Sequence, residues 1–126
     1  MIVEKELSYQ IIAAAMEVHK ELGPGFLESV YEAAMKSELE ARGHTVEVQR
    51  RVPVFYKQHK IGEHVLDQVV DNKIVLELKA VTGIAPIHKQ QALSYLKASG
   101  FSLAIVINFC CLSLQSARVV FSGNIK

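Results

Sequence analysis

An apolar run at residues 74–80 carries two charges, and this run most constrains what the chain can fold into. Its hydrocarbon side chains include Leu76 and Leu78, and its charged side chains are Glu77 and Lys79. Residues two apart on a strand share a face, so the charges project to one side and the hydrocarbon side chains to the other. The run predicts a strand with one packed face. The other face is either half-exposed with an ordinary surface ion pair or the floor of a site that binds a cation.

A further carboxylate, Asp67, lies ten residues before Glu77 on the preceding predicted strand. In a hairpin, Asp67 lies opposite Glu77 only if Val70 pairs with Ile74, which requires a three-residue loop over 71–73. A two-residue turn would instead place the two carboxylates on opposite faces of the sheet. The pairing register is therefore a sharp test of whether these carboxylates meet.

The remaining sequence changes its hydrophobic period along the chain. Apolar residues recur at helical spacing in two early segments separated by Gly23-Pro24-Gly25, and Pro86 and Gly100 bound a third helix. Alternation from Val46 to Tyr56 predicts a strand with one solvated face. The expected helices are 7–22, 26–42 and 86–99, and the expected strands are 45–57, 61–70, 73–81, 102–109 and 115–121.

The order helix, helix, three strands, helix, two strands predicts an α/β fold, in which helices flank a mixed central β-sheet. At 126 residues, with no repeats or linkers, the sequence fits one domain spanning 1–126. The formal net charge is +1, so any nucleic-acid contact must come from a local basic patch.

The ends of the chain and its cysteines limit its location and chemistry. Acidic residues near the N-terminus and the lack of a long apolar segment predict a cytosolic protein without a membrane span. Cys110 and Cys111 are adjacent, and neighbouring side chains on a strand point to opposite faces, so they are poorly placed for a mutual disulfide. As a metal site they lack two further ligands at a recognisable spacing.

The convergence of Asp67, Glu77 and Lys79 has a chemical interpretation. Two close carboxylates repel one another unless a cation or protons neutralise them. Oxygen ligands suit Mg²⁺ or Mn²⁺, which also accept water and substrate phosphate, and a lysine can stabilise charge that develops at phosphorus. These residue types fit phosphodiester hydrolysis. The alternative is that Glu77 and Lys79 form a solvent-exposed pair worth less than about 1 kcal/mol.

The same residues carry a resemblance to a known family. Asp67, followed by Glu77-x-Lys79 on the next strand, resembles the catalytic signature of the PD-(D/E)XK nuclease superfamily. Residues 25–31 also match the Gly-x-x-Glu-x-x-Tyr motif of the bacterial GxxExxY protein family, through Gly25, Glu28 and Tyr31. Further similar segments are 18–23, 88–97 and 107–109, and the similarity extends over about residues 7–122.

The resemblance implies a restriction-endonuclease-like core and a Mg²⁺ (or Mn²⁺) cofactor. Asp67 and Glu77 would be metal ligands, Lys79 the catalytic lysine, and Glu28 the helix-borne carboxylate that completes the metal shell. Gln91 would orient water or substrate. From the residues alone, an acid at the position of Glu28 is equally typical of a first helical turn, where it stabilises the helix dipole by a few tenths of a kcal/mol.

Four further residues are possible auxiliaries or structural residues. His88 and Tyr95 share one helical face with Gln91, and that face can look into the site. Tyr95 can equally be core, and His88 can be a solvated residue near a helix start. His19 and Tyr31 carry the same ambiguity. Gln68 follows Asp67 where such nucleases usually have an apolar residue, which disturbs packing beneath the site without removing a ligand.

Two functions follow from these residues. The first is a metal-dependent nuclease or phosphodiesterase acting on nucleic acid, with DNA as the expected partner. The second is a non-catalytic module with the nuclease fold, which binds an ion, a small phosphate compound or nothing. A homodimer or a protein partner is compatible with either function. The residues available to hold a nucleic-acid backbone are Arg50, Arg51, Lys57, Lys60, Lys89 and Lys97.

Overall fold

A computed structural model describes residues 3–124. The fold is α/β, with a five-stranded mixed sheet flanked by helices, and its order of elements agrees with the sequence expectation. A short 3₁₀ turn, Ser122–Asn124, follows the last strand. The elements are α1 (Lys5–Leu22), α2 (Glu28–Ala41), β1 (Val46–Tyr56), β2 (His59–Val70), β3 (Ile74–Lys79), α3 (Pro86–Ser99), β4 (Leu103–Asn108) and β5 (Gln115–Val120).

The strands lie in their sequence order, β1-β2-β3-β4-β5. Only β3 and β4 are parallel, because α3 carries the chain back between them, and the other neighbours are antiparallel. All six residues of β4 are buried, as are five of the six in β3. These two strands form the centre of the sheet and fix the position of the charged run.

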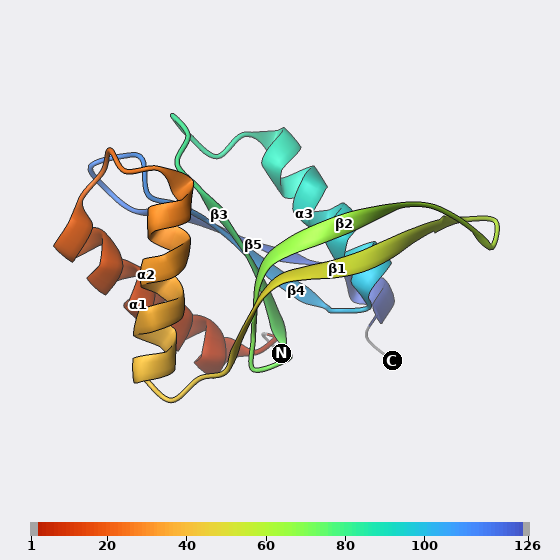
Figure 1. The fold of residues 1–126 in the computed structure, drawn as a ribbon, viewed down its shortest axis with the longest axis horizontal. Helices are drawn as coiled ribbons and strands as arrows, with labels where there is room; N and C mark the ends of the chain where they lie inside the picture. The colour runs from red at the N-terminus through yellow and green to blue at the C-terminus, as the bar shows by residue number, and fades with distance from the viewer. Residues whose placement is uncertain (1–2, 125–126) are drawn as a thin grey trace.

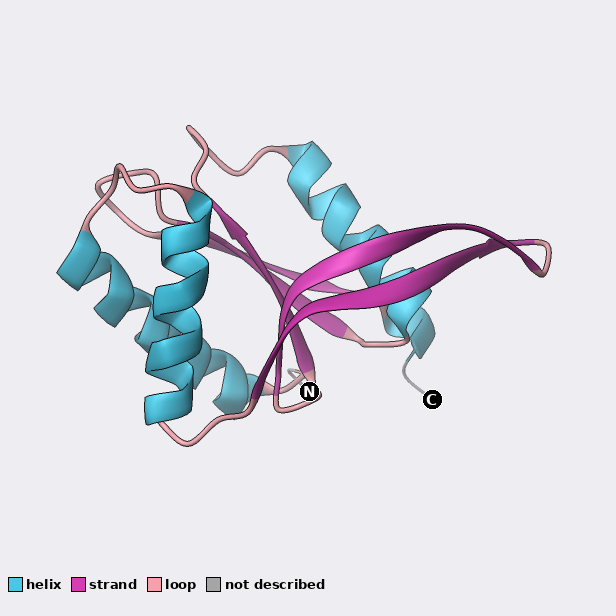
Figure 2. Ribbon diagram, viewed as in Figure 1, coloured by secondary structure: helices cyan, strands magenta, loops and turns pink. Residues whose placement is uncertain are grey.

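Helices cover the two faces of the sheet separately (Figures 1 and 2). On one face, α1 and α2 pack their apolar side chains against Leu76, Leu78 and the matching positions of β4. On the other face, α3 packs Tyr95 and Leu96 against a second cluster. Leu76 and Leu78 therefore face α1 and α2, and the alternation of a strand turns Glu77 and Lys79 toward the α3 side.

Strand β2 has two neighbouring strands at its C-terminal end and one neighbouring strand along the rest of its length. It pairs with β3 only at Gln68, Val69 and Val70, whereas it pairs with β1 almost throughout. Beyond this contact, β1 and β2 continue as a long curved ribbon that leaves the sheet and passes α3 (Figure 1). Asp67 is the first residue of β2 outside the paired segment.

The register required for the two carboxylates is confirmed. Val70 pairs with Ile74, and the turn is the three-residue loop 71–73. The loop begins with Asp71 and Asn72, whose φ angles are 52° and 54°. This left-handed conformation is one that Asp and Asn adopt more readily than most residues, so the loop sequence supports the register.

Several sequence expectations need correction. Helix α2 begins at Glu28, two residues after the expected start. Cys110 and Cys111 are free thiols but lie beyond β4, in the loop before β5, so the argument from strand alternation does not apply to them. The alternation from Val46 to Tyr56 would place Tyr56 on the packed face of the first strand, but Tyr56 is 59% exposed. No helix within residues 3–124 has both the length and the apolar character needed to span a membrane.

Candidate active site

Asp67 lies at the point where β2 separates from β3. Its Oδ2 accepts a hydrogen bond of 2.9 Å from the backbone N–H of Leu78. In a continuous ladder that N–H would bond a carbonyl of β2, so the side chain takes the place of the departing strand. This bond holds the carboxylate in the gap between the two strands, beside Glu77.

Glu77 is buried with one oxygen unsatisfied. Its side chain is 4% exposed, and Oε1 has no hydrogen-bond partner within the described chain. Burial, followed by the negative charge of Asp67, raises the pKa of Glu77 to about 9, although the charge of Lys79 opposes the shift. In the protein alone, Glu77 keeps its proton at neutral pH, and a hydrogen bond to Asp67 favours this state. An unsatisfied buried carboxyl group is costly unless a ligand completes it.

Asp67 and Lys79 complete a cluster of three groups. Burial raises the pKa of Asp67, while the Leu78 N–H, the Glu77 carboxyl and the charge of Lys79 each lower it. Lys79 is half-buried at the end of β3, on the same face as Glu77. The structure therefore brings Asp67, Glu77 and Lys79 together as the strand register requires.

Glu32 of α2 is a further carboxylate near the cluster, and the sequence analysis did not identify it. It lines a pocket of about 220 Å³ together with Asp67 and Gln68. Burial, then Asp67 and Glu28, raise the pKa of Glu32. Glu28 itself is exposed at the start of α2. The two acids lie four residues apart and share a helix face, so the spacing Glu28-x-x-x-Glu32 was the available signal.

Gln68 closes the floor of this pocket. Its Nε2 donates a 2.7 Å hydrogen bond to the carbonyl of Glu32, and the residue is 1% exposed. Its Oε1 has no partner within residues 3–124. The expected disturbance of apolar packing is thus resolved by a bond that ties β2 to α2, and a second buried oxygen beside Asp67 is left unpaired.

Three comparisons with known proteins bear on this geometry. A sequence profile of the PD-(D/E)XK nuclease superfamily matches residues 5–119. The chain belongs to the PD-(D/E)XK nuclease superfamily. The crystal structure of SSO0001 matches with a TM-score of 0.59 at 16% identity, over 73% of this chain and 48% of that chain. This likeness concerns the fold alone, and the present chain spans about half the length of that protein. No curated protein matches the sequence.

Within this superfamily fold, α3 brings Tyr95 toward the carboxylates. Burial, followed by the charges of Glu77 and Asp67, raises the pKa of Tyr95 to about 12. The Tyr95 ring contacts the His64 ring edge-on, with 4.5 Å between centroids. Tyr95 is therefore both core and neighbour of the site, and His64 is a second neighbour that the sequence analysis did not single out.

The other two expected residues of α3 have different surroundings. Gln91 is exposed, its backbone carbonyl accepts the Ser94 hydroxyl at 2.7 Å, and no described hydrogen bond joins its side chain to the carboxylates. His88 Nδ1 accepts the backbone N–H of Ala85 at 2.9 Å. This contact caps the first turn of α3, so His88 has a structural role.

His19 and Tyr31 each make a hydrogen bond to a backbone carbonyl. The Tyr31 hydroxyl donates a 2.5 Å hydrogen bond to the carbonyl of Gly23, and its ring stacks on Phe109 with centroids 4.5 Å apart. His19 Nε2 donates to the carbonyl of Cys111 at 2.8 Å. The tyrosine of the Gly-x-x-Glu-x-x-Tyr segment thus fixes the turn between α1 and α2 against the end of β4.

PD-(D/E)XK nucleases generally use divalent metals. In the described chain, no group of three or more His, Cys, Asp or Glu side chains is arranged to hold a metal ion. Asp67 and Glu77 nevertheless fit Mg²⁺, which usually binds one or two carboxylates and keeps water and substrate phosphate in its other positions. Oε1 of Glu77 is buried and has no partner among residues 3–124, so it is the oxygen that such an ion would satisfy.

Proposed function

We propose that this chain is a divalent-metal-dependent nuclease that hydrolyses phosphodiester bonds of DNA. The observation that carries the proposal is the pair of buried carboxylates, Asp67 and Glu77, beside Lys79 at the gap between β2 and β3. A purely structural pair would be expected to have all of its oxygens satisfied. Membership of a nuclease superfamily supports the same reaction.

Each residue of the cluster has a role in this proposal. Asp67 and Glu77 would hold Mg²⁺ or Mn²⁺, and the ion when bound would supply charge neutralisation at the phosphate and a lowered pKa for its water. Lys79 stabilises negative charge that develops on the phosphate oxygens. Metal binding requires both carboxylates to be ionised, so Glu77 releases its proton on loading.

The helices supply the outer positions. Glu32 is a better candidate than Glu28 for the helix-borne carboxylate, because Glu32 lines a pocket with Asp67 whereas Glu28 is exposed. Gln91 is exposed on α3, one turn before Tyr95, where it can orient water or substrate that enters from solvent. We therefore assign the helix-borne role to Glu32 in place of Glu28, and Gln91 acts only with substrate bound.

A cleavage assay tests the activity. End-labelled single- and double-stranded DNA is incubated with the protein in Mg²⁺, in Mn²⁺ and in EDTA. We expect metal-dependent cleavage that Glu77→Gln and Lys79→Ala each reduce by at least about 100-fold. The matched controls are Glu40→Gln and Lys5→Ala, exposed positions on α2 and α1, which keep wild-type rates. Full activity in either site variant overturns the assignment.

The second candidate function is the non-catalytic module, because no group of three or more His, Cys, Asp or Glu side chains in the described chain is arranged to hold a metal ion. A calorimetric titration separates this module from the nuclease. Mg²⁺ and Mn²⁺ are titrated into wild type and into the Asp67→Asn, Glu77→Gln double variant, with and without a non-hydrolysable phosphorothioate oligonucleotide. Binding that the double variant loses supports the site. Wild-type binding of neither ion, even with the oligonucleotide, favours the non-catalytic module.

A further inference from the structure

The ribbon of β1 and β2 differs in charge from the rest of the chain. Residues 50–65 contain four Lys or Arg and one acid, Glu63, whereas the other 110 residues contain ten Lys or Arg and twelve Asp or Glu. A chain with a net charge of +1 thus concentrates positive charge on one projecting element. A polyanion is attracted to the ribbon and repelled by the remainder. The four cations are Arg50, Arg51, Lys57 and Lys60.

Exposed aromatic rings lie among these cations at the outer end of the ribbon. Phe55 and Tyr56 are 60% and 59% exposed. Phe55 pairs across the ribbon with Lys60, and Lys57 Nζ lies 5.4 Å from the centroid of the Tyr56 ring. Exposed rings flanked by cations can stack unpaired bases while the cations contact the phosphates. We call Phe55, Tyr56, Lys57 and Lys60 the ribbon surface.

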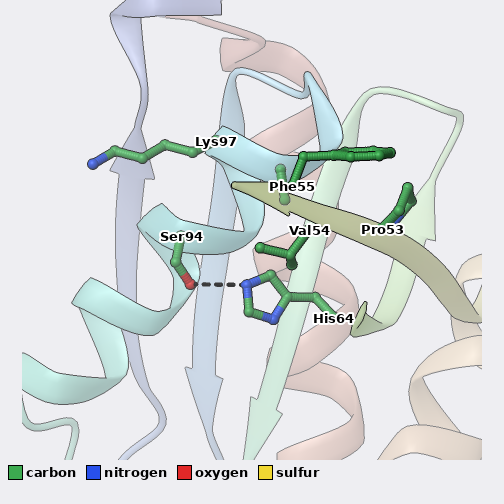
Figure 3. A pocket seen from close by; sticks show the side chains of 7 residues that line it. Pro53, Val54, Phe55, His64, Ser94 and Lys97 are labelled. Atoms are coloured by element: carbon green, nitrogen blue, oxygen red, sulfur yellow. Dashed lines mark hydrogen bonds between the residues drawn. The ribbon is translucent and has the colours of Figure 1, made fainter. Parts of the chain in front are cut away.

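A pocket of about 370 Å³ lies at the inner end of the ribbon surface, between the ribbon and α3. Val54 and Phe55 give it an apolar wall, and His64 and Ser94 give it polar groups, as Figure 3 shows. The Ser94 hydroxyl donates to the carbonyl of Gln91, so its oxygen can accept the Nε2–H of His64 at 3.4 Å. In this tautomer, His64 Nδ1 remains an acceptor for the N–H of a base.

Tyr95 lies between the pocket and the carboxylate cluster. The ring of His64 contacts Tyr95, and the charges of Glu77 and Asp67 reach Tyr95. His64 precedes Asp67 by three residues on β2, a distance of about 10 Å along a strand. The first residue of β2, His59, follows the turn at the far end of the ribbon and precedes Asp67 by eight residues, or about 26 Å along a strand. A strand of nucleic acid on the ribbon surface therefore leads toward the carboxylates.

We propose that the ribbon surface binds single-stranded DNA and directs it to the carboxylate cluster, with one unpaired base in the pocket at His64. This substrate class rests on the proposed nuclease function for cleavage, but the binding does not. In duplex DNA the bases are paired and stacked on one another. They therefore cannot stack on Phe55 and Tyr56 or enter the pocket. Unpaired bases expose the π-faces that aromatic side chains stack on, whatever their sequence.

A binding titration in EDTA tests the proposal without cleavage. The probe is a fluorescein-labelled 12-nucleotide thymidine oligomer, read by anisotropy, and the comparison is a 12-base-pair duplex. We expect wild type to bind the single strand at least about tenfold more tightly, and Phe55→Ala with Tyr56→Ala to lose about tenfold or more of that affinity. The control is Tyr9→Ala, an aromatic on α1 that is 73% exposed, which retains wild-type affinity.

Salt dependence tests the cations separately. Lys57→Ala with Lys60→Ala should reduce the slope of log affinity against log salt by about 1.4, since each phosphate contact on a single strand contributes about 0.7. The control, Lys5→Ala with Lys20→Ala on α1, leaves the slope unchanged. Equal or tighter binding of the duplex, or unchanged affinity in the folded aromatic variant, overturns the ribbon surface. Cleavage of DNA without this binding would support the nuclease function and overturn the role of the ribbon surface. Binding without cleavage would support the role of the ribbon surface and overturn the nuclease function.

Discussion

Two aspartates four residues apart in sequence, Asp67 and Asp71, have opposite environments. Asp71 begins the β2–β3 loop, and its carboxylate accepts hydrogen bonds from His44 Nδ1 at 2.7 Å and from the Thr45 N–H at 2.8 Å. Although burial opposes the shift, these bonds lower the pKa of Asp71. For Asp67 burial prevails, and its pKa is raised although Leu78, Glu77 and Lys79 oppose the shift.

The difference distinguishes a carboxylate that builds the fold from one that is held ready for a ligand. Asp71 ties the start of β1 to the loop and is satisfied by the protein itself. Asp67 has Glu77 beside it, and the protein leaves an oxygen of Glu77 unpaired. Both residues are aspartates near the C-terminal end of β2, one inside the strand and one just after it, so their surroundings decide the role. Four experiments can break or sharpen this comparison.

The largest expected effect is on activity. Asp67→Asn should reduce metal-dependent cleavage by at least about 100-fold, because a neutral amide is a poor ligand for a hard cation. Asp71→Asn should leave the rate per folded molecule within about threefold of wild type. Initial rates on labelled DNA give both numbers. The comparison fails if the two variants lose activity equally while both remain folded.

The second experiment measures the free energy of unfolding. Asp71→Ala should lower the free energy of unfolding by about 2 kcal/mol, since it removes three hydrogen bonds and leaves His44 and Thr45 without their acceptor. Asp67→Asn should cost less, because the amide oxygen of the asparagine still accepts the backbone N–H of Leu78. Urea denaturation followed by circular dichroism measures both. A larger loss in Asp67→Asn than in Asp71→Ala would reverse the assignment.

The third experiment uses pH. Glu77 has a raised pKa, from 4.5 to about 9, so between these values the folded chain holds a proton that the unfolded chain has released. Stability of the metal-free protein should therefore fall as pH rises from 5 to 8, by on the order of 4 kcal/mol. Asp71 has a lowered pKa, and its contribution is lost only as pH falls below its unfolded value of 3.8.

The matched variant for this experiment is Glu77→Gln, which carries no titrating group and should flatten the fall in stability between pH 5 and 8. Saturating Mg²⁺ should flatten it in wild type, because the ion binds the ionised form. Unfolding midpoints in EDTA at three pH values provide the measurement. A wild-type profile that Glu77→Gln leaves unchanged would show that other groups, such as the histidines, cause the dependence.

The smallest expected effect concerns the two turns that bound β2. Asp71 and Asn72 adopt left-handed φ angles at low cost, whereas Lys57 and Gln58 adopt φ angles of 46° and 74° with side chains that disfavour them. Gln58→Gly should stabilise the protein by about 0.5–1 kcal/mol. Asn72→Gly should change stability less. Thermal unfolding compares the two, and a destabilising Gln58→Gly would mean that its side chain makes a needed contact.

Sequence patterns predicted most of the fold for identifiable reasons. Helix α3 is bounded by Pro86 and Gly100, whose backbone preferences are local, and both of its expected ends are confirmed. The register of β2 and β3 followed from requiring Asp67 to meet Glu77. The start of α2 was placed two residues early, because Phe26 and Leu27 continue the apolar pattern although neither belongs to the helix.

The surroundings of the site were less predictable. Periodicity places Glu28 and Glu32 on one face of α2, but only tertiary packing puts Glu32 in the pocket with Asp67. The path of the β1–β2 ribbon is also non-local, so nothing in the sequence indicated that His64 would reach Tyr95. His88 and Tyr31 match the sequence patterns of candidate site residues, yet their hydrogen bonds are to backbone groups of nearby turns.

The bond from the Leu78 amide to Asp67 has a consequence for solubility. Beyond Leu76, β3 is paired with β4 along one side only, and the backbone groups on its other side have no strand partner among residues 3–124, so they need another partner or a cover to keep strands from pairing there. Asp67 occupies the amide at that edge and places a carboxylate there. An alanine at this position would remove both protections, so Asp67→Ala is expected to self-associate where Asp67→Asn stays monodisperse. The residue proposed to hold the metal is thus also expected to keep other strands from pairing with β3.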